Sequence, residues 1–167
     1  EYFEEDNNYL YTIAQFYPRM CQYSDNEGWQ NKQFLGGGEF ALSFGYYEMN
    51  LTVPGDHIVA SNSLYGGTYN LLSVTLPRLG ITTTFVDPSD PNNFGKAVKD
   101  NTRAIFVESL GNPKLDVLDL KAISSEAKNA KIPFIVDNTV ASPALLNPIE
   151  HGANIVIHSL TKYINGN

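Results

Sequence analysis

From Pro54 onward, short apolar runs rich in β-branched residues alternate with stretches of helical character. The runs predicted to be strands are DHIVAS, TTTFVD, RAIFVES, PFIVDNT and NIVIHS. Each is nearly continuous in its hydrophobicity, which is typical of strands that are buried on both faces. The intervening stretches, predicted to be helices or helical turns, are GGTYNLLSVTLPRL, NNFGKAVKD, LDLKAISSEAKNA and PALLNPIEHG. This alternation predicts right-handed βαβ crossovers and therefore a three-layer αβα domain with a mostly parallel sheet.

The composition excludes several classes of function. Hydrophobic residues make up 43% of the 167 residues, which is enough for one domain-sized core. The net charge of -7 argues against a nucleic-acid partner, because phosphate binding needs clustered Lys and Arg. Cys21 is the only cysteine and the three histidines stand singly, so no metal site is predicted. The sequence has no bilayer-spanning apolar window and an acidic N-terminus, which predicts a cytoplasmic protein with no membrane partner.

Polar residues follow the predicted strands at the edge where such sheets bind ligands. In a parallel sheet of this kind, ligands bind beyond the carboxyl ends of the strands. The residues at these ends include an aromatic ring, carboxylates, an amide, hydroxyls and a lysine, in the order Tyr65, Glu108, Asn112, Asp137, Ser159, Thr161 and Lys162. We therefore expect one site to contain all of these chemical groups.

These residue types together meet the needs of pyridoxal phosphate. Lys162 offers an amine that can hold the cofactor aldehyde as an imine. Asp137, at the end of an apolar strand, offers the carboxylate that keeps the pyridine nitrogen protonated. Tyr65 is followed by two glycines that allow close approach, so its ring can stack on the cofactor. Ser159 and Thr161 flank the lysine and offer hydroxyls to the phosphate.

Each residue also has a purely structural interpretation. Asp137 in the sequence DNT can form an Asx-turn with its own backbone. Glu108 can cap a neighbouring helix, and His158 can be a core or edge histidine. The S-x-T-K and GNP segments can be simple turns. The order along the chain nevertheless favours a cofactor site, because the tyrosine, the amide, the carboxylate and the lysine follow successive strands of one domain.

The same segments resemble a known family. The stretches GDHIVASNSLYGGTYNLLSVTLPRLGITTTFVDPSDPNNF, ESLGNPKLDVLDL and VDNTVASPALLNPIEHGANIVIHSLTKYINGN are similar to the Cys/Met-metabolism family of pyridoxal-phosphate enzymes. The resemblance implies part of the large domain of a fold-type I pyridoxal-phosphate-dependent transferase. It also implies a role for each residue: Lys162 as the Schiff-base lysine, Asp137 on the pyridine nitrogen, Tyr65 on the ring, Asn112 near the ring hydroxyl, and Ser159 and Thr161 on the phosphate.

Upstream of Pro54 the resemblance weakens. Family members carry a Ser-Gly-Gln or Ser-Gly-Met turn whose amides bind phosphate, and the corresponding stretch here is LSFGYYE, with Phe44 in place of the serine. Gly45 and Tyr46 are still expected to offer backbone amides, since these do not depend on the side chain.

A second upstream motif implies an assembly. Tyr17 and Arg19 resemble the family's Tyr-x-Arg, which reaches the phosphate of a neighbouring subunit, although the Asn-Pro-Thr that follows it in the family is missing. The expected assembly is a homodimer or tetramer. Residues 1–40 are expected to form an N-terminal arm and irregular segment, and residues 41–167 part of the cofactor-binding large domain. The family's C-terminal small domain is expected to be absent from a truncated chain.

The resemblance implies γ-replacement on an activated homoserine. The expected substrates are O-acetyl-L-homoserine and sulfide, and the products are L-homocysteine and acetate, in methionine and cysteine biosynthesis. Another activity of the family, such as that of cystathionine γ-synthase or methionine γ-lyase, is an alternative, and so is a non-catalytic truncated relative. A nucleotide-binding domain is disfavoured, because no G-x-G-x-x-G follows a strand and no Walker lysine turn is present.

Overall fold

The computed structural model describes residues 4–6, 9–11, 51–160 and 162–165. Its centre is a seven-stranded sheet in the order β1-β2-β7-β6-β5-β3-β4. Neighbouring strands run parallel except for the antiparallel pair β1–β2. The strands are β1 (Glu4–Asp6), β2 (Tyr9–Tyr11), β3 (His57–Ser61), β4 (Thr82–Val86), β5 (Thr102–Glu108), β6 (Phe134–Asp137) and β7 (Ile155–Ile157).

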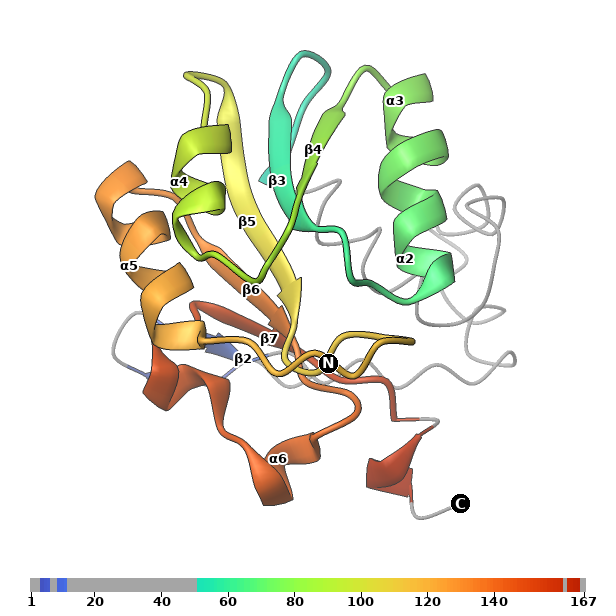
Figure 1. The fold of residues 1–167 in the computed structure, drawn as a ribbon, viewed down its shortest axis with the longest axis vertical. Helices are drawn as coiled ribbons and strands as arrows, with labels where there is room; N and C mark the ends of the chain where they lie inside the picture. Colours follow the sequence, from blue (N-terminus) through green and yellow to red (C-terminus); the bar gives the residue numbers. More distant parts are fainter. Residues whose placement is uncertain (1–3, 7–8, 12–50, 161, 166–167) are drawn as a thin grey trace.

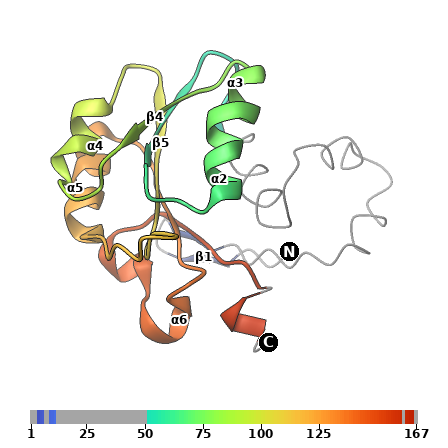
Figure 2. The same ribbon diagram turned by 45° about the vertical axis from the view of Figure 1, so that its right-hand side comes forward.

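Helices cover both faces of the sheet, as Figures 1 and 2 show. One face carries a continuous helical stretch made of α2 (Gly66–Asn70), the π-helical η3 (Leu71–Thr75) and α3 (Leu76–Arg78). The other face carries α4 (Asn92–Ala97) and α5 (Leu120–Ala130). Shorter elements follow β6 and β7: α6 (Ser142–Leu145), η4 (Pro148–His151) and η5 (Tyr163–Asn165). The predicted three-layer αβα fold is confirmed.

Each face of the sheet has its own hydrophobic cluster. Ile58 and Phe106 pack in the cluster that includes Leu72 of η3. Their chain neighbours Val59 and Ile105 point to the opposite cluster, which includes Ile123 of α5. The central residues of such strands must be apolar on both faces of the sheet, which explains why the strands appear in the sequence as continuous hydrophobic runs.

The prediction of burial on both faces holds for β3, β5, β6 and β7 but is wrong for β4. Thr82 is exposed and the residues from Thr83 to Val86 are only half-buried. The reason is position, since among the strands that the structure describes β4 pairs only with β3 and forms the edge of the sheet. The run of three threonines fits such an edge, because their hydroxyls tolerate solvent.

The helix predicted after β6 is also interrupted. Asn147 is extended, with φ -108° and ψ 96°, and separates α6 from η4. Pro148 explains this break, because a proline disfavours helical backbone in the residue before it and has no N–H to donate. Similarly, the helix predicted over NNFGKAVKD ends at Ala97, and Val98 is extended.

The strand order brings the predicted site residues to one edge. From β3 the chain crosses to β4 on one side and then to β5 on the other, so the direction of winding reverses between β3 and β5. Ligands of open α/β sheets bind at such a reversal, beyond the carboxyl ends of the strands. In Figure 1 these ends point to the lower edge, where the start of α2, the loop after β5, α6 and η5 also lie. Among the described residues, no helix is both long and apolar enough to cross a membrane.

Candidate functional site

The start of α2 is tied to the end of β5. Tyr65 caps α2, and its backbone N–H donates a hydrogen bond to Oε1 of Glu108 at 2.6 Å. Glu108 therefore has the capping role that the sequence left open. The residue it fixes, Tyr65, remains 42% exposed at the carboxyl edge of the sheet. A ring in this position is accessible to a ligand that binds beyond the strands.

Two acids lie side by side at this edge. Glu108 and Asp137 are partners in the parallel ladder of β5 and β6, and both side chains are on the α2 face of the sheet. They are 4% and 5% exposed. Burial, followed by the charge of Asp137, raises the pKa of Glu108 to about 8. Burial likewise raises the pKa of Asp137 to about 7. Within the described part of the chain, neither acid forms an ion pair with a basic side chain.

Asp137 is connected to the end of β7 through Thr139. The backbone N–H of Thr139 donates to Oδ1 of Asp137 at 2.9 Å, which is the Asx-turn geometry expected from the structural interpretation of DNT. Oγ1 of Thr139 accepts a hydrogen bond from the N–H of Ser159 at 2.8 Å. The backbone of Asn138 also donates to the carbonyl of Ile157 at 2.8 Å. These bonds hold β6 and β7 together beyond their last ladder pair.

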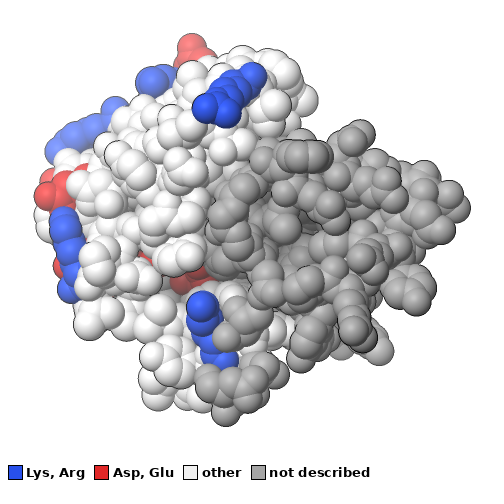
Figure 3. Space-filling view, turned by 90° about the vertical axis from the view of Figure 1, so that its right-hand side faces the viewer, with Lys and Arg blue, Asp and Glu red and all other residues white. Residues whose placement is uncertain are grey.

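Ser159 and Lys162 form the turn that follows β7. Ser159 is buried, and its carbonyl accepts a hydrogen bond from the backbone N–H of Lys162 at 3.3 Å. The Lys162 side chain is exposed. In the view of Figure 3, a few acidic atoms show at the border of the described surface, above a basic side chain. The remaining predicted contacts, Thr161, Gly45, Tyr46, Tyr17 and Arg19, lie outside the described residues.

Asn112 lies in a loop that is fastened to the end of β3. A bridge between Leu110 and Val117 closes this loop. A side chain at Gly111 would overlap Oγ of Ser63, so only glycine allows this close approach. The backbone N–H of Asn112 acts as a hydrogen-bond donor that lowers the pKa of Glu108, against the larger effect of burial. Glu108 thus receives backbone donors from both Tyr65 and Asn112.

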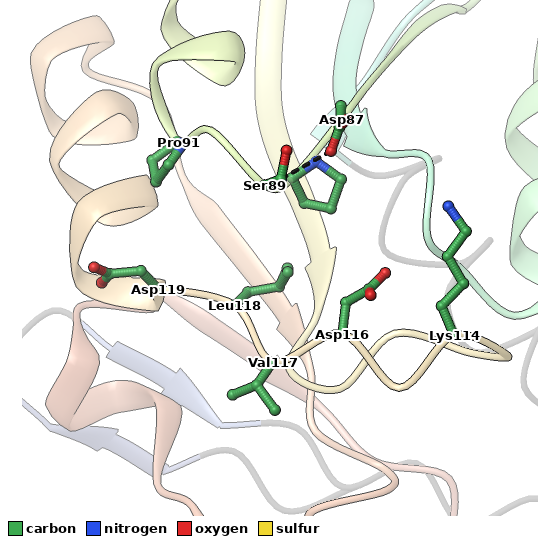
Figure 4. Close-up of a pocket in the computed structure, with 9 residues that line it drawn as sticks. Asp87, Ser89, Pro91, Lys114, Asp116, Val117, Leu118 and Asp119 are labelled. Carbon is green, nitrogen blue, oxygen red and sulfur yellow. Dashed lines mark hydrogen bonds between the residues drawn. The ribbon is translucent and has the colours of Figure 1, made fainter.

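A pocket of about 410 Å³ lies between the segment that follows β4 and the loop that follows β5. Figure 4 shows its two walls: Asp87, Ser89 and Pro91 follow β4, and the loop after β5 supplies the second wall from Lys114 to Asp119. The lining residues include none of the predicted cofactor contacts. One of them, Asp116, accepts a hydrogen bond from Oγ of Ser63 at 2.7 Å, so the pocket wall is part of the support of the Asn112 loop.

Sequence reasoning missed one residue that connects the site. Thr139 follows a strand-ending aspartate by two residues, and this Asx-turn pattern signals its backbone bond to Asp137. Nothing in the local sequence signals the bond to Ser159, which is 20 residues away.

His158 is half-buried after β7, and burial lowers its pKa. The described residues contain no cluster of three or more His, Cys, Asp or Glu side chains able to hold a metal.

The raised pKa of Glu108 predicts a pH-dependent gain in stability for a Glu108→Gln variant. The folded pKa of about 8 lies above the ordinary value of 4.5, so the folded chain binds more protons between these values. The wild-type stability contributed by the protonated acid is complete below about pH 4.5 and is lost as the pH rises toward 8. Glutamine keeps an acceptor for Tyr65 but does not ionise. Between these two pKa values, the free energy of unfolding of the Glu108→Gln variant, relative to that of the wild type, should therefore rise by at most about 1.4 kcal/mol per pH unit.

Urea unfolding at a series of pH values measures this difference. The control is Glu150→Gln, which removes an exposed carboxylate and should show a much smaller change over the same range. An equal pH dependence in the two variants would mean that Glu108 does not hold a proton in the folded chain.

Comparison with known proteins agrees with this geometry. Residues 38–167 match the family described as Cys/Met metabolism PLP-dependent enzyme. An O-acetyl-L-homoserine sulfhydrylase of Leptospira meyeri is 58% identical over 118 residues, which are 71% of this chain and 27% of the relative. A cystathionine gamma-lyase of Bacillus subtilis is 45% identical over 118 residues, or 71% of this chain and 31% of that protein.

A solved structure shows the same fold. The crystal structure of an O-acetylhomoserine (thiol)-lyase from Campylobacter jejuni, which carries N'-pyridoxyl-lysine-5'-monophosphate, matches with a TM-score of 0.72 and 44% identity. The match covers 74% of this chain and 30% of that one. The chain thus spans less than a third of the length of these relatives. With its family match over most of its length and the shared αβα fold, the chain belongs to the Cys/Met metabolism family of PLP-dependent enzymes.

Proposed function

We propose that the protein binds pyridoxal phosphate at the carboxyl ends of β3, β5, β6 and β7 and catalyses γ-replacement on O-acetyl-L-homoserine with sulfide. The observation that carries the cofactor proposal is the environment of Asp137. Its carboxyl group is 5% exposed, has a pKa raised to about 7, and has no ion-pair partner in the described part of the chain.

Such a carboxyl group fits a protonated pyridine nitrogen. A buried acid is costly to ionise unless a cation or hydrogen-bond donors compensate for its lost hydration. A pyridinium N–H supplies both a positive charge and a donor. Asp137 would therefore ionise when the cofactor binds, and its charge would in turn keep the ring nitrogen protonated.

The other residues of the edge have complementary roles. Tyr65 would stack on the ring, which contributes about 1 kcal/mol beyond burial. Asn112 would lie near the ring hydroxyl, and Ser159 and Thr161 would donate to the phosphate. Lys162 would bind the cofactor covalently and, once displaced by the amino group of the substrate, move protons between substrate carbon atoms. When bound, the cofactor supplies an electron sink for this proton transfer.

The degree of similarity favours the γ-replacement reaction. Identity is 58% with the Leptospira sulfhydrylase and 45% with the Bacillus cystathionine gamma-lyase. The second value makes γ-elimination the second candidate, because both reactions require removal of the α-proton of the substrate, which Lys162 would accept. Because the chain spans 27% of the sulfhydrylase, the choice of substrate and nucleophile rests on this similarity alone.

The assay that tests this function supplies the cofactor and compares substrates. We expect homocysteine to form from O-acetyl-L-homoserine and sulfide faster than 2-oxobutyrate forms from cystathionine or methionine. The opposite order of rates would replace γ-replacement by γ-elimination. Failure of the protein to bind the cofactor at all would reject both reactions.

The assembly and the cellular compartment are further parts of the proposal. A homodimer or tetramer is supported by the resemblance of Tyr17 and Arg19 to residues that act in a neighbouring subunit. A cytoplasmic location is supported by the single cysteine, Cys21, since disulfides are rare in reducing compartments. Sedimentation at several concentrations tests the assembly, and a monomer with full cofactor affinity would contradict it.

A further inference from the structure

We infer that Thr139 is a positioning residue whose hydroxyl group couples the carboxylate of Asp137 to the backbone of Ser159. It thereby fixes the acid that meets the cofactor ring relative to the turn that carries Lys162. The effect of this coupling on cofactor binding rests on the proposed function. The coupling itself is present in the protein without cofactor.

The contacts of Thr139 carry this inference. Its Oγ1 accepts a hydrogen bond from the N–H of Ser159 at 2.8 Å. A hydroxyl that accepts in this way keeps its own proton to donate. The interaction of the Thr139 side chain with Asp137 is the largest of the effects that lower the pKa of this acid against burial. The backbone N–H of Thr139 donates to Oδ1 of Asp137 as well, at 2.9 Å.

The strand neighbours of Asp137 do not stabilise its ionised form, whereas Thr139 does. On β5 the adjacent residue is the acid Glu108, which cannot offer a positive charge, and on β7 it is Ile157, which is apolar. Both donors that lower the pKa of Asp137 come from Thr139. Burial works against ionisation of this carboxyl group, and the hydroxyl and amide of Thr139 work in favour of it.

The same hydroxyl positions the turn from Ser159 to Lys162 that follows β7. The ladder between β6 and β7 ends at the pair Asp137 and Ile157. Beyond it, Ser159 is held by Thr139, and the carbonyl of Ser159 accepts the N–H of Lys162 at 3.3 Å. Loss of the hydroxyl would remove this bond between the turn and β6 and weaken the ionised form of Asp137 in one step.

The experiment compares Thr139→Val, which removes the hydroxyl at nearly constant volume, with Thr139→Ser, which keeps it. The matched control is Thr83→Val on β4, because Oγ1 of Thr83 is buried without a hydrogen-bond partner among the described residues. In the protein without cofactor, the pKa of the Asp137 carboxyl is followed by carbon NMR, together with that of Glu108. We expect the pKa of Asp137 to rise from about 7 to about 8 in the valine variant.

The serine variant and the Thr83 control should both stay near the wild-type value. An unchanged pKa in Thr139→Val, or a serine variant that behaves like the valine variant, would overturn the inference. Should the valine variant fail to fold, Thr139→Ala removes the same hydroxyl and is expected to raise the pKa of Asp137 in the same NMR titration.

A second measurement uses pyridoxal phosphate as the probe. We expect its dissociation constant to rise about tenfold in Thr139→Val, and the visible absorbance of the bound cofactor to change at a different pH from that of the wild type. Wild-type affinity and spectrum in this variant would also reject the inference while leaving the proposed function intact. If the wild-type protein binds no cofactor, the proposed function fails, and the NMR titration alone decides on the coupling.

Discussion

Replacement of Lys162 by alanine is expected to abolish covalent cofactor binding and to reduce activity by a factor of about 100 to 10,000 or more. The substitution removes the amine proposed to form the covalent bond and to transfer protons, and loss of an acid–base catalyst alone accounts for this factor. The variant should keep its fold, because the Lys162 side chain is exposed and its backbone bond to Ser159 does not need the side chain.

Reduction with borohydride followed by mass spectrometry measures the covalent bond, and absorbance in the visible range measures the bound cofactor. The control is Lys121→Ala, which removes an exposed lysine from α5. Persistence of a reducible cofactor bond in the Lys162 variant would assign the covalent role to a different lysine.

Replacement of Asp137 by asparagine is expected to leave the fold nearly intact and to remove most of the catalytic power. Asparagine can still accept the hydrogen bond from the N–H of Thr139, so the turn after β6 is preserved. A neutral amide cannot stabilise a pyridinium, however, and loss of one partner of a buried charged contact costs roughly 2 to 5 kcal/mol. This corresponds to a rate loss of about two to three orders of magnitude or more.

The measurement is exchange of the α-proton of a bound amino acid in deuterated buffer, together with a thermal melt. Exchange probes the electron-sink step without requiring the complete reaction, so it separates this step from the choice of nucleophile. If the variant exchanged protons as rapidly as the wild type, Asp137 would be a turn-forming residue only.

The sheet could be predicted from the sequence because its central strands are buried on both faces. Each of β3, β5, β6 and β7 has an uninterrupted apolar run at its centre, and such runs are distinct from amphipathic helices. The positions of Tyr65, Asp137 and Lys162 could be predicted with them, since parallel strands end at one edge. The edge position of β4 could not, because it depends on the spatial order of the strands and not on their order in the chain.

The hydrogen bonds that join the candidate site residues could not be predicted from the sequence either, for a related reason. Tyr65 and Glu108 are 43 residues apart, and Thr139 and Ser159 are 20 residues apart. No periodicity or turn pattern reports a contact at such separations, since it arises only when neighbouring strands come into register. Local chemistry suggested the candidate residues, and the pairing of the strands determines which of them lie in contact.

The adjacency of Glu108 and Asp137 would make the proposed binding of the cofactor a proton-exchange reaction. With pKa values of about 8 and 7, the two acids together hold more than one proton at neutral pH when no cation is near. In the proposed site, a positively charged ring paired with Asp137 would displace the proton of that acid into solution, while Glu108 would keep its own because its neighbour would then be charged. Acidic conditions would therefore compete with the cofactor, and the affinity of the site would increase as the surrounding pH rises through the titration of Asp137.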